Sequence, residues 1–344
     1  MTNFEKLTDI FMNLFIDLQI GLSLPLRRLL ATLTVCLLEG TPAHLTALAE
    51  ALPDVETAQV TKEQRIRRFL SNARLSPIHL LPVYIYLLRP LLTSLPEVVI
   101  SMDRTYWKKR KCHINVLMVS VYFQGRAIPL FWTVFDRKGN SSLQDWKSVL
   151  TPVITTLQSC PWLATTPIIV VADREFASPR LSEWLKTTYQ VESVLRLKRS
   201  QYLNDEAQSI KLTKLLRYFP RGATRFYRQI TVTRASTFLV NVTITWGEQY
   251  EEPLIIITTS EDAAVSVRRY SQRFGIEPMF KDHKSNGFDL ERTKVTDPKR
   301  IESLLMVIAL AHVFCTTEGY RKEFHGEAKK NGFMEILSAQ SDCF

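Results

Sequence analysis

Two aspartates stand directly after apolar runs that are typical of buried β-strands. Asp103 follows Val-Val-Ile-Ser-Met, and Asp173 follows Ile-Ile-Val-Val-Ala. Mg²⁺ and similar hard cations take oxygen ligands and keep several water or phosphate ligands, so two carboxylates at neighbouring strand ends would suit them. A single aspartate at such a position is usually a turn residue. Because the pattern occurs twice, the sequence favours a metal site over two unrelated turns.

A third acid lies in a segment with a distinctive spacing of polar side chains. The pattern Tyr-x2-Arg-x3-Glu-x6-Lys is made by Tyr270, Arg273, Glu277 and Lys284. At about 100° per residue, a regular helix would place all four on one narrow face. Such a face could grip phosphate and supply one metal ligand. Two metals about 3.5–4 Å apart could then stabilise the attacking and leaving oxygens of an in-line displacement.

The backbone of this segment leaves two geometries open. Gly275 precedes Glu277 and Pro278 follows it, and a proline inside a helix strains the helix. Either one helix continues with a kink, or Glu277 begins a new helix with Pro278 in its first turn. In the second geometry only Glu277 and Lys284 would share a face.

A run of cations follows the first aspartate, between two predicted strands. At that place the charges could seat a DNA duplex at the rim of the site. A solvated hairpin turn explains the same charges equally well. We expect three other acids, Glu175, Asp136 and Asp282, to lie beside the site or on the surface. The cationic run consists of Lys108, Lys109, Arg110 and Lys111.

The chain as a whole is basic. Its 344 residues include 44 Lys and Arg against 34 Asp and Glu, a formal net charge of +10 with a pI near 9.4, which favours a polyanionic partner. The five cysteines form neither a Cys-x2-Cys pair nor a Cys/His set, so we expect no structural zinc and a reducing compartment. The most apolar run, 78–95, contains two prolines and an arginine and predicts a buried helix, not a membrane span.

Residues 1–95 have helical periodicity and are expected to form an N-terminal DNA-binding domain. Thr61-Lys-Glu-Gln64 is a capping-box pattern that predicts the start of a cation-bearing helix. Two shorter helices before it complete the outline of a helix-turn-helix motif. A charged face of a helical bundle is an equally good interpretation. The cations that could reach DNA are Lys62, Arg65, Arg67 and Arg68.

From residue 96 the periodicity becomes that of strands. Three antiparallel strands, a helix, a strand, a helix and a strand over 96–198 predict an α/β domain with an RNase H-like core. Alternating residues over 199–258 predict an all-β insertion, and 259–317 returns to helices that complete the core. Residues 318–344 are expected to form a short tail. The expected strands span 98–103, 115–123, 127–135, 167–173 and 191–197, and the expected helices span 143–157, 179–188, 263–273 and 298–315.

Taken together, these motifs resemble the DDE transposases of bacterial insertion sequences, in the branch with a Tyr-Arg-Glu-Lys signature and a β-rich insertion. The resemblance covers roughly residues 95–317. It rests on Asp103 in Met-Asp-Arg-Thr, on Asp173 in Ala-Asp-Arg-Glu-Phe, and on the complete signature followed by Ser-Asn-Gly-Phe-Asp-Leu-Glu. Each motif alone is a weak signal, whereas the full spacing with two acids upstream is a strong one.

The resemblance implies an enzyme that transfers phosphoryl groups of DNA. Asp103, Asp173 and Glu277 would be catalytic and would bind two Mg²⁺ or Mn²⁺ ions. The metals would activate water to nick DNA at an element's end, and the freed 3′-hydroxyl would then attack target DNA in a cut-and-paste reaction. Excision through a DNA hairpin is common in this branch.

The resemblance also implies DNA contacts and partners. Tyr270, Arg273 and Lys284 would contact phosphates near the cleaved end, and Trp246 in the insertion is a candidate for holding a flipped base. Burial in a strand is the alternative for this tryptophan. The expected partners are the element's inverted repeats, target DNA and a second copy of the chain, without a membrane or a small-molecule substrate. The expected location is the bacterial cytoplasm, at the nucleoid.

Two other functions fit the same residues. A stand-alone nuclease with an RNase H-like core would cut DNA without joining it. A catalytically inactive remnant would bind DNA without cutting it.

Overall fold

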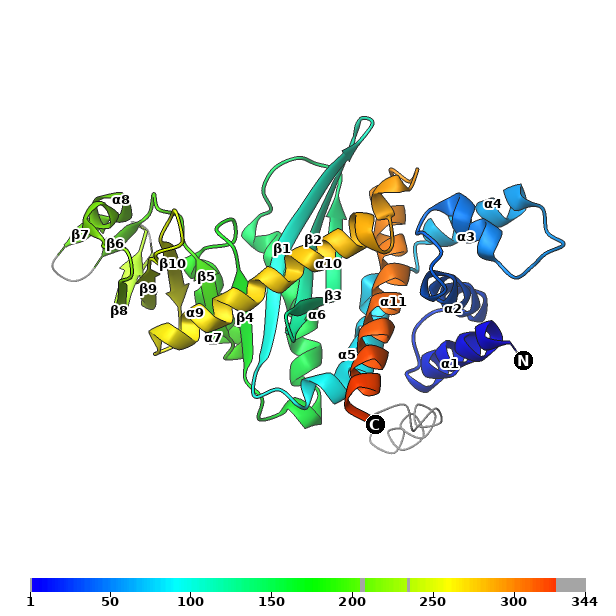
Figure 1. Ribbon diagram of the computed structural model, residues 1–344, viewed down its shortest axis with the longest axis horizontal. Coiled ribbons are helices and arrows are strands. Elements are labelled where there is room, and N and C mark those ends of the chain that lie inside the picture. Colours follow the sequence, from blue (N-terminus) through cyan, green and yellow to red (C-terminus); the bar gives the residue numbers. More distant parts are fainter. Residues whose placement is uncertain (1, 205–207, 234–235, 326–344) are drawn as a thin grey trace.

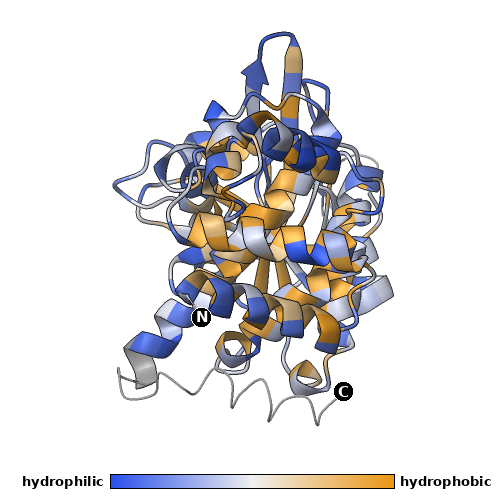
Figure 2. Ribbon diagram, turned by 90° about the vertical axis from the view of Figure 1, so that its right-hand side faces the viewer, coloured by the Kyte–Doolittle hydropathy of each residue, from blue (hydrophilic) through white to orange (hydrophobic). Residues whose placement is uncertain are grey.

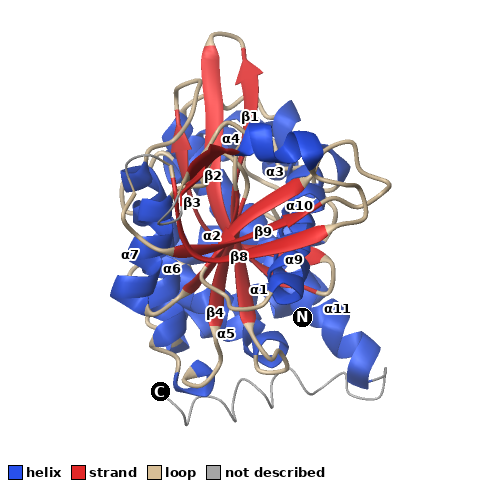
Figure 3. Cartoon of the chain, turned by 90° about the vertical axis from the view of Figure 1, so that its left-hand side faces the viewer, coloured by secondary structure: helices blue, strands red, loops and turns tan. Residues whose placement is uncertain are grey.

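The protein is described here by a computed structural model that covers residues 2–204, 208–233 and 236–325. One twisted sheet runs through these residues in the strand order β3-β2-β1-β4-β5-β10-β9-β8-β6-β7, with helices on both faces (Figures 1 and 3). The fold is mixed α/β with a helical N-terminal region, which is consistent with the expected RNase H-like class. The strands are β1 Val98–Lys109, β2 Cys112–Phe123, β3 Arg126–Phe135, β4 Ile168–Ala172, β5 Glu192–Arg196, β6 Tyr202–Asn204, β7 Ser209–Lys211, β8 Thr224–Val232, β9 Val240–Thr245 and β10 Leu254–Thr258.

The helices fall into an N-terminal group and a group that covers the sheet. α9 and α10 cross one face of the sheet, and α6 and α7 cover the other (Figures 1 and 3). α11 lies between the sheet and the N-terminal helices. The helices are α1 Asn3–Asp17, α2 Leu24–Leu38, α3 Leu45–Ala51, α4 Gln59–Leu70, α5 Leu81–Leu92, α6 Leu143–Gln158, α7 Pro179–Tyr189, α8 Leu212–Leu215, α9 Ala263–Gln272, α10 Ile276–Lys281 and α11 Pro298–His325.

The centre of the sheet follows the predicted order of elements. β1, β2 and β3 form the expected antiparallel meander, and β1, β4 and β5 are parallel neighbours. All five residues of β4 are buried, as expected for a strand covered on both faces. Because parallel neighbours end at the same edge, the residues that follow β1's buried half and β4 meet there.

The insertion extends the core sheet and does not form a separate one. β10 pairs antiparallel with β5, and β9 and β8 follow it. The prediction of an all-β insertion over 199–258 is wrong in one respect, because α8 and a 3₁₀ turn at Leu216–Tyr218 interrupt it. The apolar residues Leu212 and Leu216 of this interruption are buried in the main core, which stabilises the short helical piece.

α11 is the central helix of the molecule. It packs against β3, α2, α4 and α5, and the Tyr84 hydroxyl donates to the Met306 carbonyl at 3.2 Å. By length and composition alone Pro298–Lys322 could cross a membrane, but 72% of its most apolar window is buried within the protein. Figure 2 shows this arrangement, with apolar segments gathered in the middle and a hydrophilic turn at the tip of the β1–β2 hairpin. Residues 318–325 continue α11 into the expected tail, and 326–344 lie outside the described residues.

Two further expectations concern the N-terminal region. The apolar run 78–95 forms the buried helix α5, as predicted. The predicted capping box at Thr61–Gln64 is wrong, because α4 already begins at Gln59 after Ala58, which makes no side-chain cap. Burial of Ile66, Phe69 and Leu70 fixes the orientation of α4. Tertiary packing therefore overrides the local capping signal.

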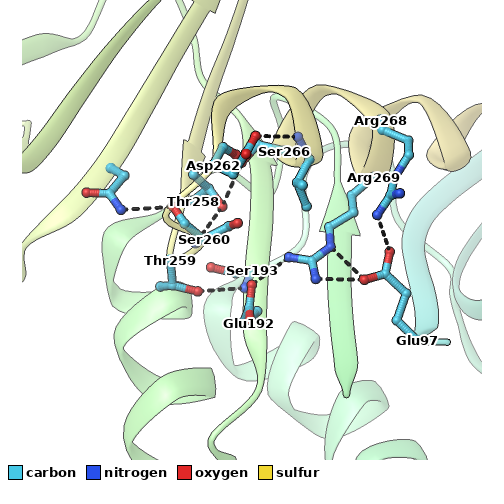
Figure 4. A network of polar contacts seen from close by, with 12 residues as sticks. Glu97, Glu192, Ser193, Thr258, Thr259, Ser260, Asp262, Ser266, Arg268 and Arg269 are labelled. Carbon is cyan, nitrogen blue, oxygen red and sulfur yellow. Dashed lines mark hydrogen bonds and ion pairs between the residues drawn. The ribbon is translucent and has the colours of Figure 1, made fainter. Parts of the chain in front are cut away.

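An ion-pair network attaches α9 to the sheet (Figure 4). Arg269, whose side chain is 9% exposed, donates to Glu97 at 2.7 Å and to Glu192 at 2.6 Å. Glu97 directly precedes β1, and Glu192 begins β5. The N-terminus of α9 is capped by Asp262, which accepts from the backbone N–H of Val265 at 2.9 Å. These contacts fix α9 across three parallel strands.

Candidate active site

Asp103 and Asp173 occupy matching positions on neighbouring strands. The last register pair between β1 and β4 is Met102 with Ala172, so each aspartate is the next residue along its strand. Val99 and Val171 share a buried cluster with Tyr270 of α9, and each aspartate is an even number of residues further on. Both carboxylates therefore extend from the face of the sheet that α9 covers.

The segment from Tyr270 to Lys284 is one helical path with two irregular turns. α9 ends at Gln272, a 3₁₀ turn follows at Arg273–Gly275, and a π turn at Asp282–Asn286 follows α10. The kinked helix is therefore the observed geometry, and Glu277 is the second residue of α10 and not a cap. A Cβ at Gly275 would lie 3.1 Å from the Arg126 carbonyl carbon, so glycine permits the close approach to the β2–β3 hairpin.

Arg273 joins two of the three acids. Its guanidinium donates to Asp103 Oδ2 at 2.7 Å and to Glu277 Oε1 at 2.8 Å. The Arg273 side chain is 5% exposed, whereas that of Glu277 is 59% exposed. Asp173 accepts from the Tyr270 hydroxyl at 3.0 Å and lies 3.6 Å from Arg196 of β5. The predicted residues Asp103, Asp173, Tyr270, Arg273 and Glu277 thus form one cluster.

The acids of this cluster differ in acidity. Burial raises the pKa of Asp103 to about 6, and the charges of Asp173 and Glu277 add to the rise. Burial also acts on Asp173, but the Arg174 backbone N–H, the Arg273 charge and the Tyr270 hydroxyl outweigh it and lower its pKa. Burial and the neighbouring Asp173 raise the pKa of Tyr270 to about 12, so the phenol remains a hydrogen-bond donor.

The donor set has the chemistry of a divalent-metal site. Asp103, Asp173 and Glu277 supply only carboxylate oxygens, the ligands that Mg²⁺ and Mn²⁺ take. Over residues 2–204, 208–233 and 236–325, no group of three His, Cys, Asp or Glu side chains is close enough to hold an ion as it stands. The guanidinium of Arg273 lies between Asp103 and Glu277. Both could ligate one ion after this guanidinium moves.

Lys284 and the cationic run lie on the same side as the site. Lys284 Nζ lies 3.1 Å from Glu291 and 5.4 Å from the ring of Trp107 in β1. Lys109 Nζ also contacts Glu291, at its carbonyl oxygen, 2.7 Å away. The run forms the β1–β2 hairpin turn, where Lys108, Arg110 and Lys111 are exposed.

The N-terminal cations are in different environments. Lys62 is 6% exposed and donates to the Leu52 carbonyl at 3.2 Å, so it is not on the surface. Arg65 and Arg68 line a hollow of about 390 Å³ between α2 and α4, together with Arg28.

Trp246 follows β9, half-buried within the insertion. Its indole N–H donates to the Tyr250 carbonyl at 2.9 Å, and the Arg221 guanidinium lies 5.4 Å from its ring. Its proposed contact with a base stays a prediction.

Sequence reasoning missed two residues of the cluster. Arg196 could have been found by register, because Ala172 pairs with Leu195 and the next positions are Asp173 and Arg196. Phe274 carries no signal in the sequence. It is 48% exposed, its ring lies 4.6 Å from the Arg273 guanidinium carbon, and it meets Tyr270 edge-on.

A mixed α/β sheet that gathers three acids and an arginine at one edge defines a class of candidate phosphoryl-transfer proteins. Residues 147–314 match a family model described as the transposase DDE domain. The match includes Asp173 and the whole segment from Tyr270 to Lys284, and Asp103 lies before it. No curated protein matches the chain. The family match supports a DDE transposase, an enzyme that acts on DNA.

Proposed function

We propose that this protein is the transposase of a bacterial insertion sequence. It would cleave DNA at the element's ends and join the freed 3′-hydroxyls to target DNA by cut-and-paste. The observation that carries the proposal is the convergence of Asp103, Asp173 and Glu277, which are linked through Arg273 and Tyr270. The family match over residues 147–314 supports the same reaction class.

In this proposal the three carboxylates hold two Mg²⁺ or Mn²⁺ ions. Bound metals would lower the pKa of water and offset charge on the leaving oxygen. Asp103 and Asp173 start from neighbouring strand ends, and Glu277 starts from a half-exposed helix that can adjust. The protein's contribution is to set the spacing of these oxygens and to exclude other ligands.

Arg273 has a second role in this proposal. Its guanidinium holds Asp103 and Glu277 in place while metal is absent. A DNA phosphate at the site offers the same bidentate acceptor geometry and can draw the guanidinium away. The carboxylates are then free to bind metal. Tyr270 remains on Asp173 and keeps that carboxylate oriented.

The DNA path follows from the remaining cations. The exposed hairpin cations Lys108, Arg110 and Lys111 extend from the strand that carries Asp103 and would seat the duplex. Lys284 would reach a phosphate by exchanging Glu291 for it. Arg65 and Arg68 on α4 would bind DNA further from the cleaved bond. Two copies of the chain would hold two element ends together.

The proposal is tested with DNA that carries the inverted repeats flanking the gene. The purified protein is incubated with Mg²⁺ and a target plasmid, and the products are separated by size. Joined products support the transposase. Nicked but unjoined DNA would instead indicate a stand-alone nuclease, and shifted but uncut DNA would indicate an inactive binding protein. An Asp103→Ala variant is the control for contaminating nucleases.

A further inference from the structure

The opposite face of the sheet carries an ion pair directly beneath the acid cluster. Arg104 directly follows Asp103, and Glu175 lies two residues after Asp173. Arg104 Nη2 and Glu175 Oε2 are 2.7 Å apart, and the two side chains are 17% and 20% exposed. Because side chains alternate along a strand, Arg104 points away from the face that holds Asp103.

Glu175 is itself held by a second set of contacts. Its other carboxylate oxygen accepts from the backbone N–H and the hydroxyl of Ser141, each at 3.2 Å. The Ser141 hydroxyl accepts in turn from the indole N–H of Trp146 in α6, at 2.8 Å. The Trp146 ring meets Phe176 edge-on, with centroids 5.5 Å apart. Glu175 is therefore anchored to α6 as well as to Arg104.

The two aspartates need this support to different degrees. β1 continues to Lys109 and stays paired with β2, so the backbone of Asp103 is fixed on that side. β4 ends at Ala172, and Asp173 begins a turn that the Phe176 N–H closes onto the Asp173 carbonyl at 2.9 Å. A turn with so few backbone contacts is positioned by its side chains. The ion pair is the direct contact between this turn and β1.

We propose that Arg104 and Glu175 act as a latch that sets the distance between the carboxylates of Asp103 and Asp173. Neither latch residue would touch metal or DNA. The latch acts through the turn that carries Asp173, and its loss would weaken the affinity of the site for divalent metal. This inference rests on the proposed metal-dependent function.

The test measures Mn²⁺ binding to the full-length protein by the loss of the free-ion signal in electron paramagnetic resonance. We expect Arg104→Gln and Glu175→Gln each to weaken Mn²⁺ affinity by roughly 10- to 100-fold, as outer contacts of metal ligands do. Because the residues act as one unit, the double variant is expected to bind no more weakly than the weaker single variant. Arg104→Lys, which keeps the charge, should recover part of the affinity.

Arg137 provides a matched control. It pairs with Asp145 at 2.8 Å beside the same loop, and its side chain is 52% exposed. Arg137→Gln should leave Mn²⁺ affinity unchanged. Thermal unfolding of every variant is measured alongside, and a latch variant that unfolds earlier but binds Mn²⁺ like the wild type would overturn the latch. Additive losses in the double variant would also overturn it.

The same titration separates the latch from the function on which it rests. If the wild type binds Mn²⁺ and Asp103→Ala does not, the metal site stands and the latch variants alone decide the inference. If Asp103→Ala binds Mn²⁺ as well as the wild type does, the proposed metal site is wrong and the latch fails with it.

Discussion

At the scale of single residues, the site is organised around one arginine. Arg273 has a side chain that is 5% exposed and contacts two acids that come from a strand and a helix. A hydrogen bond to a charged group contributes about 1.5–3 kcal/mol. The guanidinium therefore both holds the carboxylates and competes with any cation for them.

Replacement of Arg273 by Gln should strengthen metal binding to the free protein. We expect Mn²⁺ to bind at least about tenfold more tightly, because a factor of ten needs only about 1.4 kcal/mol and two charged hydrogen bonds are removed. The measurement is a Mn²⁺ titration without DNA. Arg268→Gln is the control, because that side chain is 63% exposed and contacts Glu97. Equal or weaker binding by the Arg273 variant would contradict the competition.

Asp103 should give the protein a pH-dependent stability. Its pKa is about 6 in the folded protein against an ordinary value of 3.8, so between these values the folded state holds a proton that the unfolded state has released. Its contribution is therefore fully present below about pH 4 and is lost as the pH rises to about 6. Asp103→Asn removes this dependence. Urea unfolding from pH 4 to 7 should show the wild type losing stability relative to this variant, and parallel curves would refute the assignment.

At the scale of elements, local signals and long-range pairing differ in what the sequence reveals. The apolar runs before Asp103 and Asp173 predict their strands, because buried parallel strands need continuous apolar residues. The spacing from Tyr270 to Lys284 predicts a shared helix face, although the 3₁₀ and π turns are not readable from it. The pairing of β10 with β5 is not predictable, because no local pattern specifies a partner so far along the chain.

Two boundaries illustrate the same difference. The capping pattern at Thr61–Gln64 is a valid local signal, but α4 starts earlier because its buried face packs against α3 and α11. Gly319 would ordinarily suggest a helix end, yet it lies within α11. The Arg104–Glu175 contact was also invisible, since Glu175 was expected only beside the site or on the surface.

The network that attaches α9 should contribute measurably to stability. Arg269→Gln leaves Glu97 and Glu192 without their main cation, and breaking a mostly buried ion pair costs roughly 3 kcal/mol. Arg268→Gln removes a more exposed partner of the same glutamate and should cost less than about 1 kcal/mol. The free energy of unfolding in urea compares the two. Equal losses would show that burial of Arg269 does not matter.

At the scale of the whole molecule, the net charge of +10 is a property that DNA binding can use. The β1–β2 hairpin places exposed cations at one end of the strand that carries Asp103 (Figure 1). The N-terminal arginines of α4 form a second cationic region across α11. A duplex at the acid cluster is therefore expected to meet the hairpin first.

The hairpin contribution can be measured through salt dependence. The double replacement of Lys108 and Lys111 by Gln should lower the slope of log K against log salt concentration by about 1.8, at about 0.9 per phosphate contact. Lys186→Gln on α7, which covers the opposite face of the sheet, should leave the slope unchanged. A slope that does not respond to the hairpin variant would place the duplex elsewhere.

The convergence of three acids on one reaction is tested most directly by single-turnover cleavage of element-end DNA. The rate is measured with saturating Mg²⁺ for the wild type and for Asp103→Asn, Asp173→Asn and Glu277→Gln, with DNA affinity determined on the same samples. Each variant should lose at least about 10³-fold in rate, because metal ligation supplies several kcal/mol, while DNA affinity stays within a few-fold. A wild-type rate in any one of the three variants would remove that residue from the site and contradict the proposed mechanism.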